Sequence, residues 1–343
     1  MKKELFSGYD AAAYGAMLAS VGFIPIYPTS FASEIANKIS YSGQEACKIT
    51  GFESQSSALA AAIGSEACER RTFVASNSLE AMQEFYDMSA MRLPIVSVMK
   101  SHRIFALRDS GFIIFLPESN QEILDTVIQA YRICEDSKVL LPAIINVDSP
   151  GFRETIIVPN KKAIEAFLPK LRLQSKLDFK NPLPMTKDSK IAIQLAMKSS
   201  LKLIEKIDEK WKIKFKRSYG LVEKYFLDDA EYAFVVAGYN APTAKSVVKK
   251  LREQGEKVGL LRLRVFRPFP DENVKTALKN VKRVAVVEQN VSLGDLGVFY
   301  QEVKQSCGFC SDFIPMKYMN EKDFFDIFAR LKKAEKEERL WVD

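Results

Sequence analysis

The chain has 343 residues, more than one hydrophobic core usually organises, so at least two domains are expected. Its hydrophobic fraction of 47% and charged fraction of 27% are typical of a globular protein. No apolar run approaches the ~18 residues that cross a bilayer, and the first lysines precede no apolar signal segment. The net charge of +7 is mild, and aromatic residues are not interleaved with basic ones. We therefore expect a cytoplasmic protein that binds neither membrane nor nucleic acid.

Helix and strand patterns alternate over residues 1–149. The expected helices are 9–21, 57–68, 79–91 and 120–134, and the expected strands are 23–27, 72–76, 95–99, 112–115 and 141–147. This alternation predicts an α/β domain built on a doubly wound parallel sheet. In such sheets ligands bind beyond the carboxyl ends of the strands.

The remaining chain divides into a connector at 150–229 and a second α/β domain at 230–343. The connector is dotted with prolines and holds a long basic amphipathic helix, expected at 191–215. The expected elements of the last domain are strands at 232–237, 258–265, 284–288 and 313–319, and helices at 241–254, 271–278, 296–305 and 321–336. The charged tail after residue 332 is expected to fray.

The cysteines suggest no complete metal site. Of the five, only Cys307 and Cys310 have a chelating spacing, and His102 is the only histidine. Zinc sites use four ligands and iron–sulfur clusters usually four thiolates, so one pair builds neither. The pair is then a redox-active dithiol, a contribution to a cluster shared between subunits, or a coincidence.

Short motifs along the chain lie where strands end or helices begin. They are YPTS (27–30), ESQSSA (53–58), RLPIV (92–96), RDSG (108–111), NQE (120–122), YGLVE (219–223) and LRLRVFRPFP (261–270). In order and spacing they resemble the α subunit of the thiamine-diphosphate-dependent 2-oxoacid:ferredoxin oxidoreductases, the pyruvate:ferredoxin type in particular.

The resemblance implies a fold and a set of partners. The fold is a thiamine-diphosphate pyrimidine-binding domain followed by a domain like the C-terminal domain of transketolase. The implied activity is oxidative decarboxylation of a pyruvate-type 2-oxoacid with CoA, giving acyl-CoA and reduced ferredoxin. In the family, a β subunit holds the diphosphate and Mg²⁺, and ferredoxin-like or γ subunits carry the iron–sulfur clusters. Such an α subunit is not active alone.

The cofactor-facing residues depart from the family at one position. The resemblance places Tyr27, Pro28 and Gln55 at the cofactor. The family has a glutamate where this chain has Gln55; that glutamate bonds the pyrimidine ring nitrogen and so promotes proton loss from the thiazolium carbon. Glutamine can hydrogen-bond but cannot exchange a proton in this way. Glu53 is the alternative carboxylate, or else it stabilises a helix N-terminus.

The substrate-facing residues are also altered. By resemblance, Thr29 and Ser30 contact the 2-oxoacid, while His102, Arg103 and Arg108 gather where the family binds the substrate carboxylate, a suitable ligand for arginine. The other interpretation of this basic loop is a solvated sheet edge.

Two functions follow from these departures. The chain is either a catalytic α subunit with altered substrate or activation, or a diverged non-catalytic α-type subunit serving as scaffold or regulator. The sequence does not select one 2-oxoacid.

Overall fold

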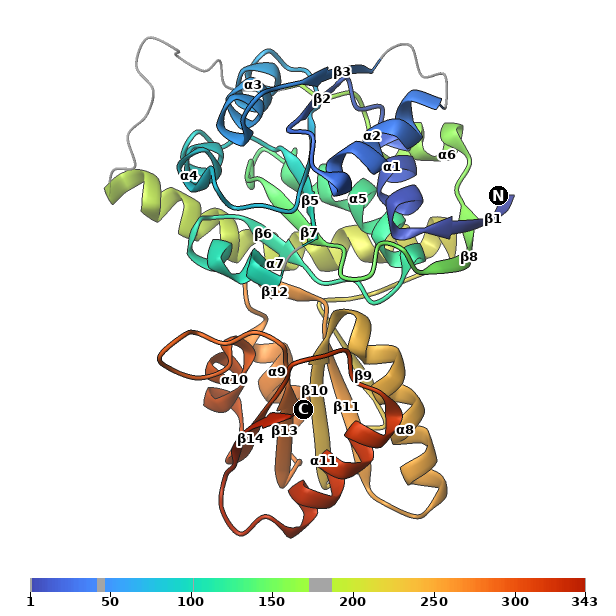
Figure 1. The fold of residues 1–343 in the computed structure, drawn as a ribbon, viewed down its shortest axis with the longest axis vertical. Coiled ribbons are helices and arrows are strands. Elements are labelled where there is room, and N and C mark those ends of the chain that lie inside the picture. Colours follow the sequence, from blue (N-terminus) through green and yellow to red (C-terminus); the bar gives the residue numbers. More distant parts are fainter. Residues whose placement is uncertain (1, 42–46, 101, 173–186, 343) are drawn as a thin grey trace. The chain divides into compact units, whose positions relative to one another are not determined.

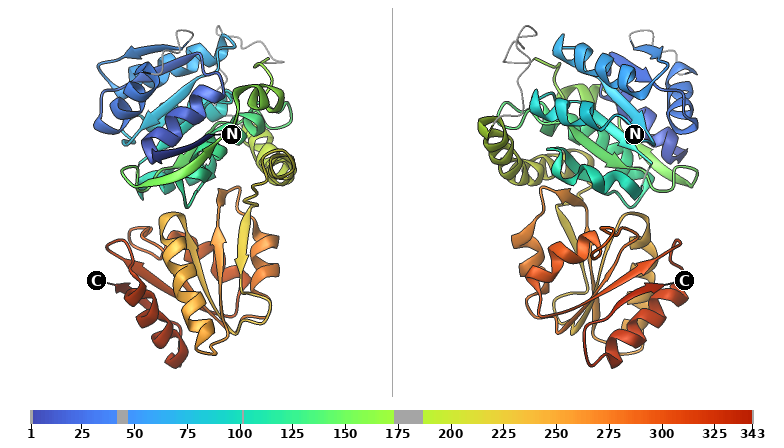
Figure 2. Two further views of the ribbon diagram at one scale, coloured as in Figure 1. Left: turned by 90° about the vertical axis from the view of Figure 1, so that its right-hand side faces the viewer. Right: turned by 60° about the vertical axis from the view of Figure 1, so that its left-hand side comes forward.

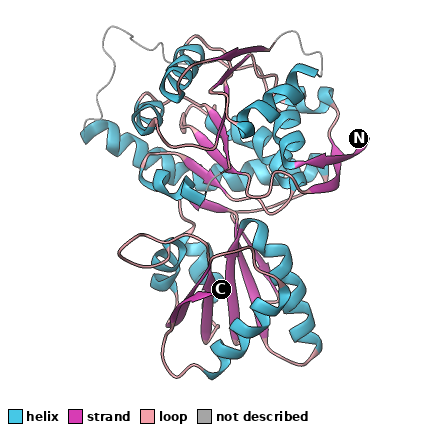
Figure 3. Cartoon of the chain, viewed as in Figure 1, coloured by secondary structure: helices cyan, strands magenta, loops and turns pink. Residues whose placement is uncertain are grey.

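The computed structural model describes residues 2–41, 47–100, 102–172 and 187–342 (Figure 1). Contacts divide the chain into two compact units, Met1–Ser218 and Tyr219–Asp343. Each unit is an α/β fold, with helices and strands alternating along the chain (Figure 3). The finer division into 1–149, 150–229 and 230–343 stays a prediction.

Parallel strands form the centre of the first unit. The strands of this unit are β1 (Lys2–Ser7), β2 (Phe23–Ile26), β3 (Lys48–Gly51), β4 (Phe73–Ser76), β5 (Val96–Met99), β6 (Ile113–Phe115), β7 (Ala143–Asn146) and β8 (Arg153–Val158). β4, β5, β7 and β6 pair in parallel in that spatial order, and β2 pairs in parallel with β3. A single parallel bridge from Phe23 to Thr72 joins β2 to the start of β4. The predicted doubly wound parallel sheet is therefore confirmed.

The helices of the first unit follow the predicted alternation with three additions. They are α1 (Gly8–Leu18), α2 (Ser30–Tyr41), α3 (Gln55–Ala67), α4 (Met82–Ala90), the 3₁₀ helix η1 (His102–Asp109), α5 (Asn120–Cys134), α6 (Lys161–Phe167) and α7 (Lys187–Phe215). The sequence analysis missed these additions, α2, η1 and α6, as well as β1, β3 and β8. β1 and β8 pair antiparallel with each other across about 150 residues of sequence, which a local pattern cannot reveal.

Small residues allow the helices of this unit to approach closely. Along α1, the alanines and Gly15 are buried, and a Cβ at Gly15 would lie 2.8 Å from the Cβ of Val127 in α5. Ser7 and Asp10 form a capping box that fixes where α1 begins. The long basic helix α7 packs against α4 and α5, so its polar residues form a solvated face.

The second unit is a six-stranded sheet in the order β15-β14-β13-β10-β11-β9. Its strands are β9 (Val222–Tyr225), β10 (Tyr232–Ala237), β11 (Val258–Leu263), β13 (Arg283–Val287), β14 (Phe309–Pro315) and β15 (Arg339–Val342), with the short β12 (Val265–Arg267) after β11. Its helices are η2 (Gly238–Asn240), α8 (Ala241–Glu253), α9 (Asp271–Leu278), α10 (Val298–Val303), η3 (Lys304–Ser306) and α11 (Glu321–Lys333). Figure 2 shows α8 and α11 on one face of this sheet and α9 and α10 on the other.

Two expectations for the second unit were wrong. The strand expected at 313–319 is β14, which begins four residues earlier, and the tail expected to fray forms β15 parallel to β14. Asp312 donates its backbone N–H to Glu338 O at 2.8 Å, and Met316 donates to Val342 O at 3.1 Å. An edge strand with one paired side tolerates charged residues, which hid this strand in the sequence.

Two of the family-like motifs meet inside the second unit. β9 and β11 pair antiparallel, so Arg262 lies opposite Glu223 and forms an ion pair with it at 3.0 Å. The neighbouring Arg264 donates to Gly220 O at 2.9 Å and stacks over the ring of Tyr219. These residues therefore hold the edge of the sheet together.

Candidate functional site

The connections of the first sheet reverse direction between β2 and β4. From β2 the chain moves outward to β3, then returns to the other side of β2 to form β4 and continues to β5. Ligands of doubly wound sheets bind at this kind of switch point, beyond the carboxyl ends of the strands. A small cavity of about 10 Å³ lies there, and a cavity of that size holds about one water. It is lined by Pro25, Tyr27, Thr29, Gln55, Ala58, Leu59, Val74, Ala75 and Ser76.

Gln55 lies at this cavity because α3 begins there. Ser54 is the N-cap residue, and its hydroxyl accepts the backbone N–H of Ser57 at 3.1 Å. Gln55 is then the first residue of the helix and is only 4% exposed.

The neighbours of Gln55 fix the orientation of its amide. Nε2 donates to the hydroxyl of Ser76 at 2.9 Å and to Ser78 O at 2.7 Å, while Oε1 accepts the backbone N–H of Glu80 at 3.2 Å. A carbonyl can only accept and a backbone N–H can only donate, so nitrogen faces Ser78 and oxygen faces Glu80. Both hydrogens of the amide are therefore engaged within the protein.

The segment after β4 is the part of this site that the sequence analysis missed. Ser76 ends the strand, and its hydroxyl donates to Ser78 O at 3.0 Å and accepts the Ser78 N–H at 3.1 Å. Small polar residues directly after a buried strand, here SNS at 76–78, were the available signal.

Glu53 is not brought to the cavity. It is exposed and precedes α3, and its carboxylate accepts the hydroxyl of Ser57 at 3.4 Å. This contact lies on the outer side of the helix start, where a carboxylate also interacts favourably with the helix dipole. Its predicted catalytic role stays a prediction.

The YPTS turn contributes two of its four residues to the cavity. Tyr27 and Thr29 line it, whereas Pro28 and Ser30 are exposed. The hydroxyl of Thr29 accepts the Ala32 N–H at 3.4 Å, and Ser30 is the first residue of α2. In this structure the turn therefore also caps a helix.

Arg108, the member of the basic loop whose side chain is described, does not line the cavity. It is the second-last residue of η1, is partly buried, and lies 3.5 Å from the carboxylate of Asp109. The side chains of His102 and Arg103 lie outside the described residues. Substrate binding by these three residues stays a prediction.

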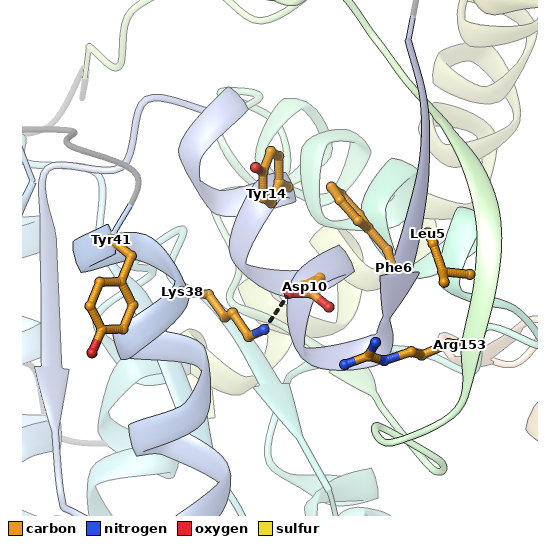
Figure 4. Close-up of a pocket in the computed structure, with 7 residues that line it drawn as sticks. All are labelled: Leu5, Phe6, Asp10, Tyr14, Lys38, Tyr41 and Arg153. Atoms are coloured by element: carbon orange, nitrogen blue, oxygen red, sulfur yellow. Dashed lines mark ion pairs between the residues drawn. The ribbon is translucent and has the colours of Figure 1, made fainter.

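A larger cavity of the first unit lies apart from these residues. Its volume is about 440 Å³, and Asp10, Tyr14, Lys38 and Arg153 are among the residues that line it (Figure 4). Asp10 pairs with Lys38 at 2.9 Å and also belongs to the capping box of α1, so this pair stabilises the contact between α1 and α2. None of the predicted site residues lines it.

Two other features are missing from the described residues. No helix among them is long and apolar enough to cross a membrane. Nor do they contain a group of three or more histidine, cysteine, aspartate or glutamate residues placed to hold a metal ion.

Both units match models of known families. Residues 97–212 match the thiamine-diphosphate-binding domain described as pyruvate flavodoxin/ferredoxin oxidoreductase, and residues 230–323 match core domain II of pyruvate:ferredoxin oxidoreductase.

Two solved structures share the fold. A 2-oxoglutarate:ferredoxin oxidoreductase from Magnetococcus marinus has a TM-score of 0.72 at 14% identity, covering 96% of this chain and 65% of that chain. A split-gene transketolase has a TM-score of 0.53 at 10% identity, covering 98% of this chain and 90% of that chain, and together these matches confirm the predicted fold class.

Curated relatives are similar over almost the whole chain. The pyruvate synthase subunit PorA of Methanocaldococcus jannaschii is 34% identical over 99% of this chain and 97% of its own length. The ketoisovalerate oxidoreductase subunit VorA of Pyrococcus abyssi is 31% identical over 88% of this chain and 84% of its own length. The chain therefore belongs to the α subunits of the 2-oxoacid:ferredoxin oxidoreductase family.

Proposed function

We propose that this chain supplies the pyrimidine side of a thiamine-diphosphate site in a complex that oxidatively decarboxylates a 2-oxoacid, with CoA and ferredoxin as co-substrates. The position of Gln55, buried at the switch point of the first sheet, is the observation that supports this most directly. The names of the relatives favour pyruvate or a branched-chain 2-oxoacid such as ketoisovalerate as substrate.

The residues at the switch point do not fit a proton relay to the cofactor. Gln55 is neutral, and both of its amide hydrogens are engaged by Ser76 and Ser78. We therefore assign no proton transfer to Gln55 in this arrangement. When bound, thiamine diphosphate supplies the nucleophilic carbon that attacks 2-oxoacids, and the role proposed for this chain is to bind and orient the pyrimidine.

The partners proposed are those of the family. A β subunit would hold the diphosphate and Mg²⁺, and ferredoxin-like or γ subunits would carry the iron–sulfur clusters.

A non-catalytic α-type subunit is the second candidate. The hydrogen bonds of Gln55 favour this candidate, because an amide held by three protein groups is a structural contact that needs no cofactor. In this case the chain would keep the fold and the subunit interface while serving as scaffold or regulator.

Substitutions at Gln55 distinguish the two candidates in the reconstituted complex. A catalytic subunit should bind thiamine diphosphate, and Gln55→Glu should raise its turnover by roughly 10²–10⁴, the usual contribution of general acid–base catalysis. Glu53→Gln is the matched control; it should leave turnover unchanged unless Glu53 supplies the carboxylate, in which case turnover is lost. Exchange of the thiazolium proton, followed by NMR, reports on activation without the later steps. Exchange no faster than in free cofactor in the unaltered complex and both variants would contradict catalysis.

The basic loop gives a separate test of substrate binding. If Arg108 donates a buried charged hydrogen bond to the substrate carboxylate, Arg108→Ala should weaken binding of the 2-oxoacid by roughly 2–4 kcal/mol. Arg153→Ala, which removes an exposed arginine at the other cavity, is the control and should leave binding unchanged. Equal binding in both variants would favour the solvated-loop interpretation.

A further inference from the structure

The second unit carries two cysteines that the proposed function does not use. Cys307 follows the 3₁₀ helix η3 in extended conformation, and Cys310 is the second residue of β14. The turn between them contains Gly308, at which a Cβ would meet no other atom within 4 Å. Each thiol shifts the pKa of the other, downward at Cys307 and upward at Cys310. Cys307 Sγ also donates to Val303 O at 3.4 Å.

The two thiols differ in their access to solvent. Cys307 is partly exposed, whereas Cys310 is completely buried. An external reagent can therefore reach the first sulfur but not the second. This asymmetry is what a dithiol needs in order to react in two ordered steps, with an attacking thiol and a resolving thiol.

A lysine is held against the turn that joins the cysteines. Lys304 Nζ donates to Gly308 O at 3.0 Å and forms an ion pair with Glu337. Glu337 in turn accepts the backbone N–H of Cys310 at 3.0 Å. The ammonium group is thereby held at the segment between the two cysteines, and its charge lowers the pKa of Cys307.

The pKa values of the two thiols agree with this geometry. Interaction with the Cys310 thiol lowers the pKa of Cys307; burial and the charge of Glu337 oppose this, and the charge of Lys304 adds to the lowering. Interaction with the Cys307 thiol, together with burial, raises the pKa of Cys310. Cys307 is therefore the thiol prepared to attack.

We propose that Cys307 and Cys310 form a redox-active site that closes to an internal disulfide by exchange with the disulfide of a small thiol or of a protein. The Cys307 thiolate attacks one sulfur of the external disulfide, forming a mixed disulfide and expelling one thiolate. Cys310 then loses its proton and attacks the Cys307 sulfur, expelling the second thiolate. The dithiol gives up two electrons, and the external disulfide becomes two thiols.

Oxidised glutathione and mass spectrometry test this on the unaltered full-length chain. After reduction, exposure to oxidised glutathione and alkylation of remaining thiols, the 307–310 peptide should be two hydrogens lighter and unalkylated. Cys68, which is exposed, provides an internal reference for accessibility. The same peptide recovered fully alkylated, or with glutathione on both cysteines, would overturn the proposal.

Variants then separate the roles of the two sulfurs and the lysine. Cys310→Ser should trap glutathione on Cys307 faster than on Cys68, although Cys68 is the more exposed. Lys304→Met should slow this step roughly threefold or more, because the thiolate loses its nearby cation. Cys68→Ser is the matched control and should leave the internal disulfide unchanged. Adduct formation at Cys307 no faster than at Cys68 would contradict the assigned roles.

Discussion

The two sheets use different groups to hold the loops beside their strand ends. In the first unit the neutral Gln55 holds the segment after β4. In the second unit the carboxylate of Glu288, directly after β13, accepts the backbone N–H groups of Phe299 and Tyr300 at 2.8 and 2.7 Å. Asp312 on β14 accepts the Gly297 N–H at 2.8 Å.

The neighbours explain why one site is neutral and the other acidic. All three backbone partners in the second unit are donors, which suits carboxylates, although burial raises the pKa of both. Gln55 faces one carbonyl and one N–H, which an amide satisfies and a carboxylate does not. The Gln55 site is therefore built for an amide, and the site in the second unit for carboxylates.

Removing Glu288 should have the largest effect on stability. Glu288→Ala leaves two buried N–H groups without an acceptor, so the free energy of unfolding should fall by about 2–6 kcal/mol. Urea denaturation of the full-length chain measures this. Glu288→Gln keeps one acceptor oxygen and should lose clearly less. Equal losses in both variants would contradict this, because neither the acceptor oxygen nor the volume that glutamine keeps would then stabilise the fold.

The pH dependence of stability should distinguish the acidic site from the neutral one. Burial raises the pKa of Asp312 to about 6, and the Gly297 N–H only partly offsets it. The folded chain then binds this proton more tightly than the unfolded chain. The stabilisation that comes from binding this proton is fully present below the unfolded pKa of about 4, and it is lost as pH rises through about 6.

Asp312→Asn removes this contribution without changing the size of the side chain. Between about pH 4 and pH 8 the unaltered chain should lose roughly 2–3 kcal/mol more stability than the variant. The other buried carboxylates titrate in both proteins, so the difference between the two denaturation series isolates Asp312. If stability changes with pH equally in the two proteins, folding does not raise the pKa of Asp312.

Placing a carboxylate at position 55 should change the free energy of unfolding by less than the titration of Asp312 does. This stability, too, should fall as pH rises. In Gln55→Glu one carboxylate oxygen faces Ser78 O, so the free energy of unfolding should fall by about 1–3 kcal/mol at neutral pH. The loss should shrink at low pH, where the protonated acid again donates. Gln55→Ala, which cannot titrate, is the control. A pH-independent loss in Gln55→Glu would show that the site accepts a charge.

Ser76→Ala should have the smallest effect of the series. It removes one partner of the Gln55 amide but leaves Ser78 O and the Glu80 N–H in place. We expect a loss of about 0.5–1.5 kcal/mol in the same urea measurement, the usual net value of one hydrogen bond. A larger loss would mean that Ser76 holds the whole turn after β4.

Local sequence patterns predicted the class of sheet and several of its elements correctly. Alternating buried strands and amphipathic helices gave α5, β10 and α9 with their observed bounds, because periodicity is a local property. β1, β8 and β15 were missed because each is a short strand with exposed residues that is stabilised by a distant or edge partner.

The surroundings of each candidate residue depend on packing between segments that are distant in the sequence. The sequence indicated Gln55 and the turn at 27–30, but the groups that hold the Gln55 amide lie 21 to 25 residues further along the chain. It also indicated the CxxC spacing, whereas the burial of Cys310 and the ion pair of Lys304 with Glu337 depend on the packing of β14 and the segment before β15. Hydrogen-bond partners and burial set the protonation of a side chain, and both arise from contacts that local sequence patterns do not encode.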